Sequence, residues 1–259
     1  MAQEQITFES ADIRIGGTLV VPDSRMADIG VICVTGGAKP ADELYNQWQW
    51  ALEERGISSL AFDARGKGSS EGEWSSYDQD PVSGIHYNSQ ASRTADTVEA
   101  VSFFRGSPDV PSRVVLLGAS MGGDIVIHAA ERLKEKPDGL LLKAPAAYDP
   151  NAHQLAYGKH LKQQLTSKHN YPAMSENFRI LHRLGLPTQL FFANGEEIIS
   201  PEIAFLYKLT VEGIGGEVVE FGDETTKHGY FFAKDELSQR ATEETIEKSA
   251  EFILGLLNR

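Results

Sequence analysis

The sequence Gly-Ala-Ser-Met-Gly at residues 118–122 decides how the rest of this chain is interpreted. It follows an apolar run at residues 114–117 that is typical of a buried strand, and it precedes apolar residues at helical spacing over 125–133. A strand that turns directly into a helix brings the backbone close around the central residue, so only glycine fits two positions before and after it. Such a turn exposes the hydroxyl of Ser120, and we predict that Ser120 is a nucleophile. The alternative is a tight turn in which Ser120 only caps the helix.

A serine hydroxyl needs help before it can attack a carbonyl group. A base must take its proton, and nearby donors must stabilise the oxyanion that follows. The helix that begins after Ser120 would present its free N–H groups and the positive end of its dipole to that charge. We therefore predict that the N–H of Met121 is one oxyanion donor.

Short apolar runs alternate with helical patterns along the rest of the chain. Strands are predicted at residues 13–21, 29–34, 57–62, 114–117, 140–142, 190–192 and 218–221, and helices around 44–52, 91–101, 125–133 and 246–257. This alternation predicts an α/β fold with a mostly parallel twisted sheet and helices on both faces. Residues 146–184 carry no strand signal and are predicted to form a small helical cap inserted between core parts 1–145 and 185–259. Whether the cap acts as a lid is left open.

Composition restricts the class of partner. The 259 residues carry a net charge of −13, which argues against nucleic acid, and the chain contains no apolar run long enough to cross a bilayer. The amino terminus lacks a signal-peptide pattern, and the single cysteine excludes an intrachain disulfide, so a cytoplasmic location is predicted. We expect a small-molecule acyl substrate and no nucleic-acid or membrane partner, and leave a homodimer open. No histidine or cysteine spacing suggests zinc and no dinucleotide or phosphate loop is present, so neither metal nor cofactor is predicted.

A second motif, Asp-Ala-Arg-Gly-Lys-Gly-Ser-Ser at residues 63–70, follows the predicted strand 57–62. Together with residues 118–122 and the order of strands, it resembles the α/β-hydrolase superfamily, and in particular its serine esterase-like members, over nearly the whole chain. The resemblance implies the α/β-hydrolase fold. In that family the loop shapes the floor of the site, so Asp63 and Arg65 are expected to have structural roles.

The resemblance also assigns a second oxyanion donor. The predicted strand 29–34 is followed by Thr35-Gly36-Gly37, where family members usually carry His-Gly, and the residue after that glycine donates its N–H. By position this donor is Gly37, although an ordinary glycine turn is the alternative. Thr35 stands in the usual histidine position and is expected to change how the loop is braced.

The base and the acid are assigned from their order along the chain, since the triad of this fold runs serine, acid, histidine. Among seven histidines, His228 alone follows the last predicted strand. The other six, assigned to loops, to the helix after Ser120 or to the cap, are expected to be solvated or hydrogen-bonded: His86, His128, His153, His160, His169 and His182. The family acid follows the strand at 190–192, and counting back from Pro201 selects Glu197. Glu196 and Asp149 stay open as alternatives.

These residues predict a serine hydrolase that cleaves a carboxylic ester through an acyl-enzyme on Ser120. His228 would be the base, Glu197 would orient it, and Gly37 and Met121 would hold the oxyanion. A thioesterase, lactonase or peptidase of the same fold is the alternative enzyme, because the fold does not choose among these reactions. A non-catalytic ligand-binding protein of the same fold is the alternative from another class.

Overall fold

The computed structural model describes residues 2–23, 27–37, 40–75, 78–80, 88–228 and 235–258. Within these residues, eight strands form one sheet in the order β1-β2-β4-β3-β5-β6-β7-β8. The strands are β1 (Ala2–Ser10), β2 (Ile13–Val21), β3 (Ile29–Val34), β4 (Ser58–Phe62), β5 (Arg113–Ala119), β6 (Gly139–Lys143), β7 (Thr188–Ala193) and β8 (Glu217–Phe221). The β1–β2 and β2–β4 pairs are antiparallel and the other pairs are parallel, which confirms the predicted mostly parallel sheet.

All seven predicted strands are present, and one strand was missed. The missed strand, β1, is an edge strand that pairs only with β2 among the described strands. Its polar residues alternate with buried Ile6 and Phe8, so the segment carries few apolar residues. By contrast, every residue of the central strand β3 is buried, and a strand covered on both faces produces the continuous apolar run that made it visible.

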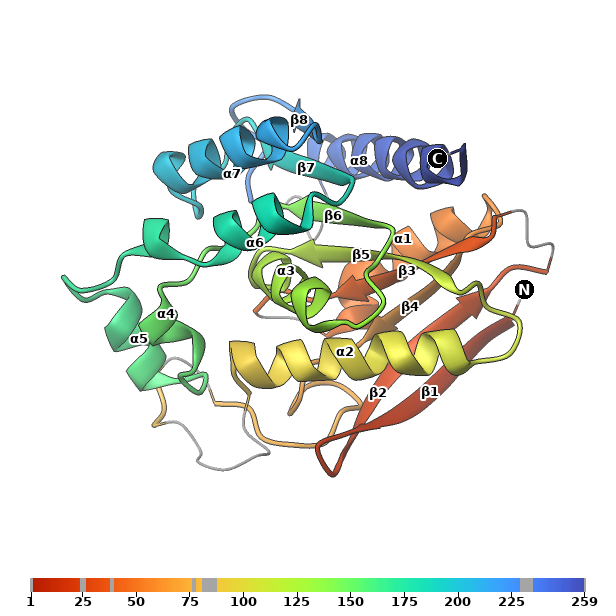
Figure 1. The fold of residues 1–259 in the computed structure, drawn as a ribbon, viewed down its shortest axis with the longest axis horizontal. Helices are drawn as coiled ribbons and strands as arrows, with labels where there is room; N and C mark the ends of the chain where they lie inside the picture. The colour runs from red at the N-terminus through yellow and green to blue at the C-terminus, as the bar shows by residue number, and fades with distance from the viewer. Residues whose placement is uncertain are drawn as a thin grey trace.

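The sheet lies between two layers of helices (Figure 1). The helices are α1 (Ala41–Glu53), α2 (Gln90–Gly106), α3 (Met121–Arg132), α4 (Pro150–His153), α5 (Lys159–Leu165), α6 (Asn177–Leu184), α7 (Pro201–Gly213) and α8 (Glu236–Gly255), with single 3-10 turns η1 (Pro172–Met174) and η2 (Leu256–Asn258). Helices α2, α3, α6 and α7 contribute to one buried cluster and α1 and α8 to the other. No helix in the described part of the chain is long and apolar enough to span a membrane.

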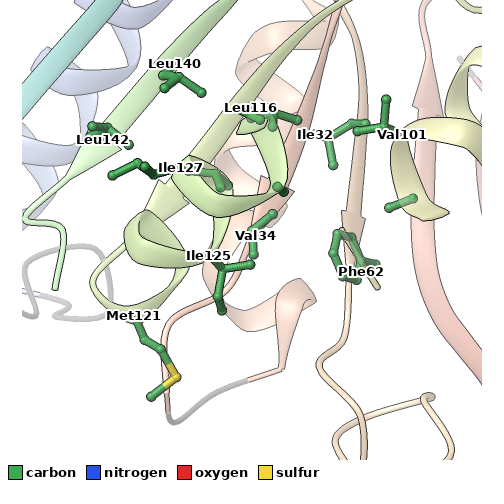
Figure 2. Close-up of a cluster of buried hydrophobic side chains, with 14 of the residues drawn as sticks. Ile32, Val34, Phe62, Val101, Leu116, Met121, Ile125, Ile127, Leu140 and Leu142 are labelled. Atoms are coloured by element: carbon green, nitrogen blue, oxygen red, sulfur yellow. The ribbon is translucent and has the colours of Figure 1, made fainter. Parts of the chain in front are cut away.

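Helix α3 is held on the sheet by a dense apolar core, drawn in Figure 2. Ile125 and Ile127 of α3 belong to the same buried cluster as Leu116 of β5 and Leu140 and Leu142 of β6. Each of these side chains is fully buried, and burying one contributes about 1.5–3 kcal/mol to folding. The first turn of α3, which follows Ser120, is therefore fixed by close packing.

Helix α7 is absent from the sequence prediction although its start is well defined. The hydroxyl of Ser200 accepts from the N–H of Ile203, and Pro201 occupies the first helical position. The helix also exposes apolar side chains, with Phe205 63% and Leu209 56% exposed. Apolar residues on both faces hide the helical period, because that period is visible only when one face is polar.

The segment between β6 and β7 holds α4, α5, η1 and α6, and contains no strand, as predicted. Figure 1 shows α4 and α5 at the left of the view, away from the amino terminus. Helix α6 packs on α3 and α7 and buries Ile180 and Leu181 in the main core. The segment is joined to the start of α2 by the N–H of Tyr157, which donates to Asn88 O at 2.6 Å. The division into core and cap stays a prediction.

Candidate active site

Ser120 lies at a strained turn between β5 and α3. Its backbone angles are φ 54° and ψ −119°. Residues other than glycine rarely adopt this conformation, which costs about 1–3 kcal/mol. The turn is held by three hydrogen bonds: Ser120 N–H donates to Lys143 O at 2.8 Å, and Ser120 O accepts from the N–H groups of Gly123 at 2.9 Å and Ala146 at 2.8 Å. The packed core and these bonds together keep Ser120 in the strained conformation.

The two flanking glycines have the steric purpose that the sequence predicted. A Cβ atom on Gly118 would lie 2.3 Å from the carbonyl oxygen of Gly122. A Cβ atom on Gly122 would lie 2.2 Å from the carbonyl oxygen of Val34. Both neighbours are backbone atoms of packed elements, so no side chain could be added at either position without moving β3 or α3.

A cavity of about 340 Å³ opens at Ser120. Gly37 and Met121 line it as well, together with an apolar wall of Ala146, Ala147, Leu165, Pro172, Ile198, Ile199 and Ile203, and with Tyr148, Tyr157 and Ser200. Met121 is the first residue of α3, so its N–H has no acceptor inside the helix. A Cβ on Gly37 would lie 2.5 Å from the hydroxyl of Tyr157. The structure thus brings Ser120 and both predicted oxyanion donors to one cavity.

His228, on the loop after β8, is paired with a carboxylate, but not with the predicted one. Its Nδ1 lies 2.9 Å and 2.8 Å from the two carboxylate oxygens of Glu196, on the loop after β7. Both side chains are largely buried, with exposed fractions of 12% and 8%. Oε1 of Glu196 also accepts from the N–H groups of Ile198 at 2.8 Å and Ile199 at 2.9 Å. Burial acts to raise the pKa of Glu196, but the bonds from His228, Ile199 and Ile198 outweigh burial and leave that pKa below its usual value.

The prediction that Glu197 contacts the imidazole is wrong. The Glu197 side chain is 56% exposed and lies 3.7 Å from Lys227 Nζ. The physical reason is local: the N–H groups after Glu197 close around the Glu196 carboxylate, which turns residue 196 inward and residue 197 to the surface. Asp149, the other alternative, caps α4 by accepting from the N–H of Asn151 at 2.8 Å.

Comparison with known proteins identifies the family of this chain. Residues 27–183, more than half of the chain, match the family described as Serine aminopeptidase, S33. The chain belongs to this family. No curated protein matches it.

Solved structures similar to this family member show the α/β-hydrolase fold, confirming that prediction. Est1E from Butyrivibrio proteoclasticus, with ferulic acid bound, has a TM-score of 0.72 at 16% identity, covering 98% of this chain and 100% of that one. The Pyrococcus furiosus esterase Pf2001 has a TM-score of 0.67 at 15% identity, covering 97% and 90%. The thioesterase domain from the curacin biosynthetic pathway has a TM-score of 0.66 at 14% identity, covering 98% and 100%.

In this family member the 63–70 loop has structural contacts. Asp63 accepts from the N–H groups of Ala41 at 2.7 Å and Ser69 at 2.8 Å. Arg65 forms a buried two-point pair with Asp96, and both side chains are 1% exposed. These contacts fasten the loop to α1 and α2, as expected for the floor of a site.

Sequence reasoning missed Arg93, a buried residue of α2 that contacts both predicted oxyanion segments. One terminal nitrogen donates to the carbonyl oxygen of Thr35 and, at 3.0 Å, to its hydroxyl, and the other lies 2.9 Å from the sulfur of Met121. Burial lowers the pKa of Arg93, against the raising effect of nearby tyrosines and Asp96. Arg93 therefore braces the loop in which threonine replaces the usual histidine.

Replacing Arg93 with methionine is expected to lower kcat for ester hydrolysis about 10- to 100-fold with little change in KM. Losing an oxyanion donor outright costs about 100- to 1,000-fold, and a loosened donor costs less. Steady-state kinetics measures this, with thermal denaturation to check the fold. Arg105→Met, in the last turn of the same helix, is the matched control: its guanidinium donates to the carbonyl oxygens of Ser112, Glu135 and Lys136, so kcat should equal that of the wild type. Equal kcat in the two variants would contradict a bracing role.

The remaining histidines divide into three groups. His86 lies outside the described residues. His160, His169 and His182 are exposed, as expected for solvated side chains. His128 and His153 are buried beside Asp124, a grouping that sequence reasoning did not find.

Proposed function

We propose that this protein is a serine hydrolase that cleaves a carboxylic ester of a small molecule through an acyl-enzyme on Ser120. The observation that carries the proposal is a strained serine that lines a cavity, together with two residues of the same wall whose N–H groups bind the acid of a His–Glu pair. Ile198 and Ile199 line the cavity at Ser120, and their N–H groups bind the carboxylate of Glu196, which contacts His228. Because β5, β7 and β8 run parallel, the loops after them emerge at one edge of the sheet.

In the proposed mechanism, Nε2 of His228 takes the proton of Ser120 as Oγ bonds to the carbonyl carbon of the ester. The carbonyl oxygen becomes an oxyanion that accepts from the N–H groups of Gly37 and Met121. The C–O bond to the alcohol then breaks, and the alcohol leaves with the proton from His228. A water molecule, deprotonated by His228, attacks the acyl-enzyme and releases the acid and Ser120. Glu196 holds the N–H of Nδ1 and stabilises the imidazolium formed in each step.

The cavity wall supports a neutral, apolar acyl group. None of the described residues that line it has a charged side chain. An aminopeptidase must bind the terminal ammonium of a peptide, and a buried cation needs a paired carboxylate. The described wall offers none, so ester cleavage is favoured over the aminopeptidase activity in the family's description. Thioesters and lactones, which also have neutral acyl groups, are the second candidates.

The proposal is tested by labelling the folded protein with a fluorophosphonate and locating the adduct by mass spectrometry. We expect one adduct, on Ser120, and hydrolysis of p-nitrophenyl butyrate. The anilide of the same acyl group should react at least about 100-fold more slowly than the ester. A folded protein without labelling would favour the ligand-binding alternative, and faster cleavage of aminoacyl anilides than of esters would favour a peptidase.

A further inference from the structure

Three side chains outside the proposed catalytic machinery converge between α3 and α4. They are Asp124, His128 and His153, and each offers one ligand atom such that all three atoms lie within 4.8 Å of one another. Asp124 and His128 are four residues apart and so share one face of α3. His153, the last residue of α4, approaches from the segment between β6 and β7, with its ring centroid 4.3 Å from that of His128.

The charge in this cluster favours a cation. Asp124 is fully buried, and its two oxygens accept from neutral amides, Gln90 Nε2 at 2.8 Å and Asn177 Nδ2 at 2.9 Å. A carboxylate buried among neutral donors attracts a positive charge, because burial removes the water that would stabilise it. Nε2 of His153 is buried without a hydrogen-bond partner in the described chain, and lies 3.4 Å from Oδ2 of Asp124. His153 is itself only 7% exposed, so this nitrogen is buried beside the Asp124 carboxylate without a hydrogen bond to it.

We propose that Asp124, His128 and His153 bind a divalent zinc ion. Two imidazole nitrogens and one carboxylate oxygen form a ligand set that zinc takes in proteins. With zinc–ligand bonds of about 2.0–2.2 Å, the ligand atoms would approach to roughly 3.4 Å from one another, a contraction that small side-chain rotations supply.

The surroundings also leave space for this ion. A cavity of about 110 Å³ borders His128 and His153 and leaves room for a water as fourth ligand. Arg132 and Glu176 both line that cavity and carry opposite charges.

Zinc bound here would stabilise the packing of the surrounding helices. Gln90 belongs to α2 and Asn177 to α6, so the two amides and His153 of α4 bring three helices against Asp124 of α3. Hydrogen bonds of this kind orient metal-ligating side chains. Tyr148 lines both this cavity and the one at Ser120, so zinc would fasten α4 to the helix that begins after Ser120, beside the substrate wall.

Zinc chloride titrated into the chelator-treated, full-length protein tests this site. Isothermal titration calorimetry is expected to give about one equivalent, and zinc at 100 times its Kd should raise the thermal midpoint by ~5 °C. His128→Gln and His153→Gln should each weaken binding on the order of 100-fold or more. His182→Gln, which removes an exposed histidine of α6, should bind zinc as the wild type does.

Failure of the wild type to bind one equivalent, or wild-type affinity in either cluster variant, would overturn the proposal. Should either variant fail to fold, crystals of the wild type grown with zinc decide the question by anomalous scattering at the zinc edge. A peak among the three side chains supports the site, and its absence overturns it. Neither measurement depends on ester hydrolysis, so the outcome is independent of the proposed function.

Discussion

Replacing Ser120 with alanine is expected to lower kcat for ester hydrolysis on the order of 10⁵-fold. The substitution removes the oxygen that forms the acyl-enzyme, and leaves Gly37 and Met121 in place. A slow residual rate, on the order of 10³-fold over water, is expected because binding and the oxyanion donors still act. Initial rates with p-nitrophenyl butyrate, measured alongside circular dichroism, check this result.

The matched control is Ser102→Ala, which removes a hydroxyl from the exposed face of α2. It should leave kcat within about twofold of the wild type. A Ser120→Ala variant that folds and keeps more than about 1% of the wild-type kcat would show that Ser120 is not the nucleophile.

Replacing Glu196 with glutamine is expected to lower kcat about 10³- to 10⁴-fold, whereas Glu197→Gln should stay within about twofold of the wild type. The amide lacks the charge that stabilises the imidazolium, and it allows the wrong tautomer of His228. Glu197 serves as a control because it is the neighbouring residue, has the same chemistry and is 56% exposed beside Lys227. The same ester assay separates the two variants, and equal losses would contradict the pairing of Glu196 with His228.

Acid titration gives the Glu196 variant a second measurement. Since the pKa of Glu196 is lowered in the folded protein, its ionised form stabilises the fold above the unfolded value of about 4.3. That contribution is lost as the pH falls through the lower, folded-state pKa. The difference in unfolding free energy between wild type and Glu196→Gln should therefore narrow as the pH falls from 6 to 3.

The sheet could be predicted from the sequence because its central strands are buried on both faces and leave continuous apolar runs. The tight turn at Ser120 could be predicted because a strand that turns directly into a helix requires glycine two residues before and after the central residue. In both cases a few adjacent residues carry the whole signal. The α/β class followed from these local patterns, and the α/β-hydrolase fold followed from the family resemblance of the 63–70 and 118–122 motifs.

The rest of the site depends on contacts between distant segments. The choice between Glu196 and Glu197 depends on how the loop after β7 closes, which counting from Pro201 does not reveal. Asp124 and His128 are visible as an i, i+4 pair, but His153 joins them only once α4 packs beside α3. Arg93 in the sequence is one cation among many on a helix, and its role appears only when Thr35 and Met121 lie against it.

Ile198 and Ile199 contribute to the site in two ways. Both residues line the cavity at Ser120, and their backbone N–H groups donate to the carboxylate of Glu196, which contacts His228. In the proposed hydrolase, part of the substrate wall and the support of the proposed acid are therefore built from the same short loop, and a change in the backbone of that loop would affect both. The segment between β6 and β7 contributes Leu165 and Pro172 to another part of the wall. Substitutions in that part of the wall are therefore the simpler route to new substrates, because they leave the proposed acid, Glu196, in place.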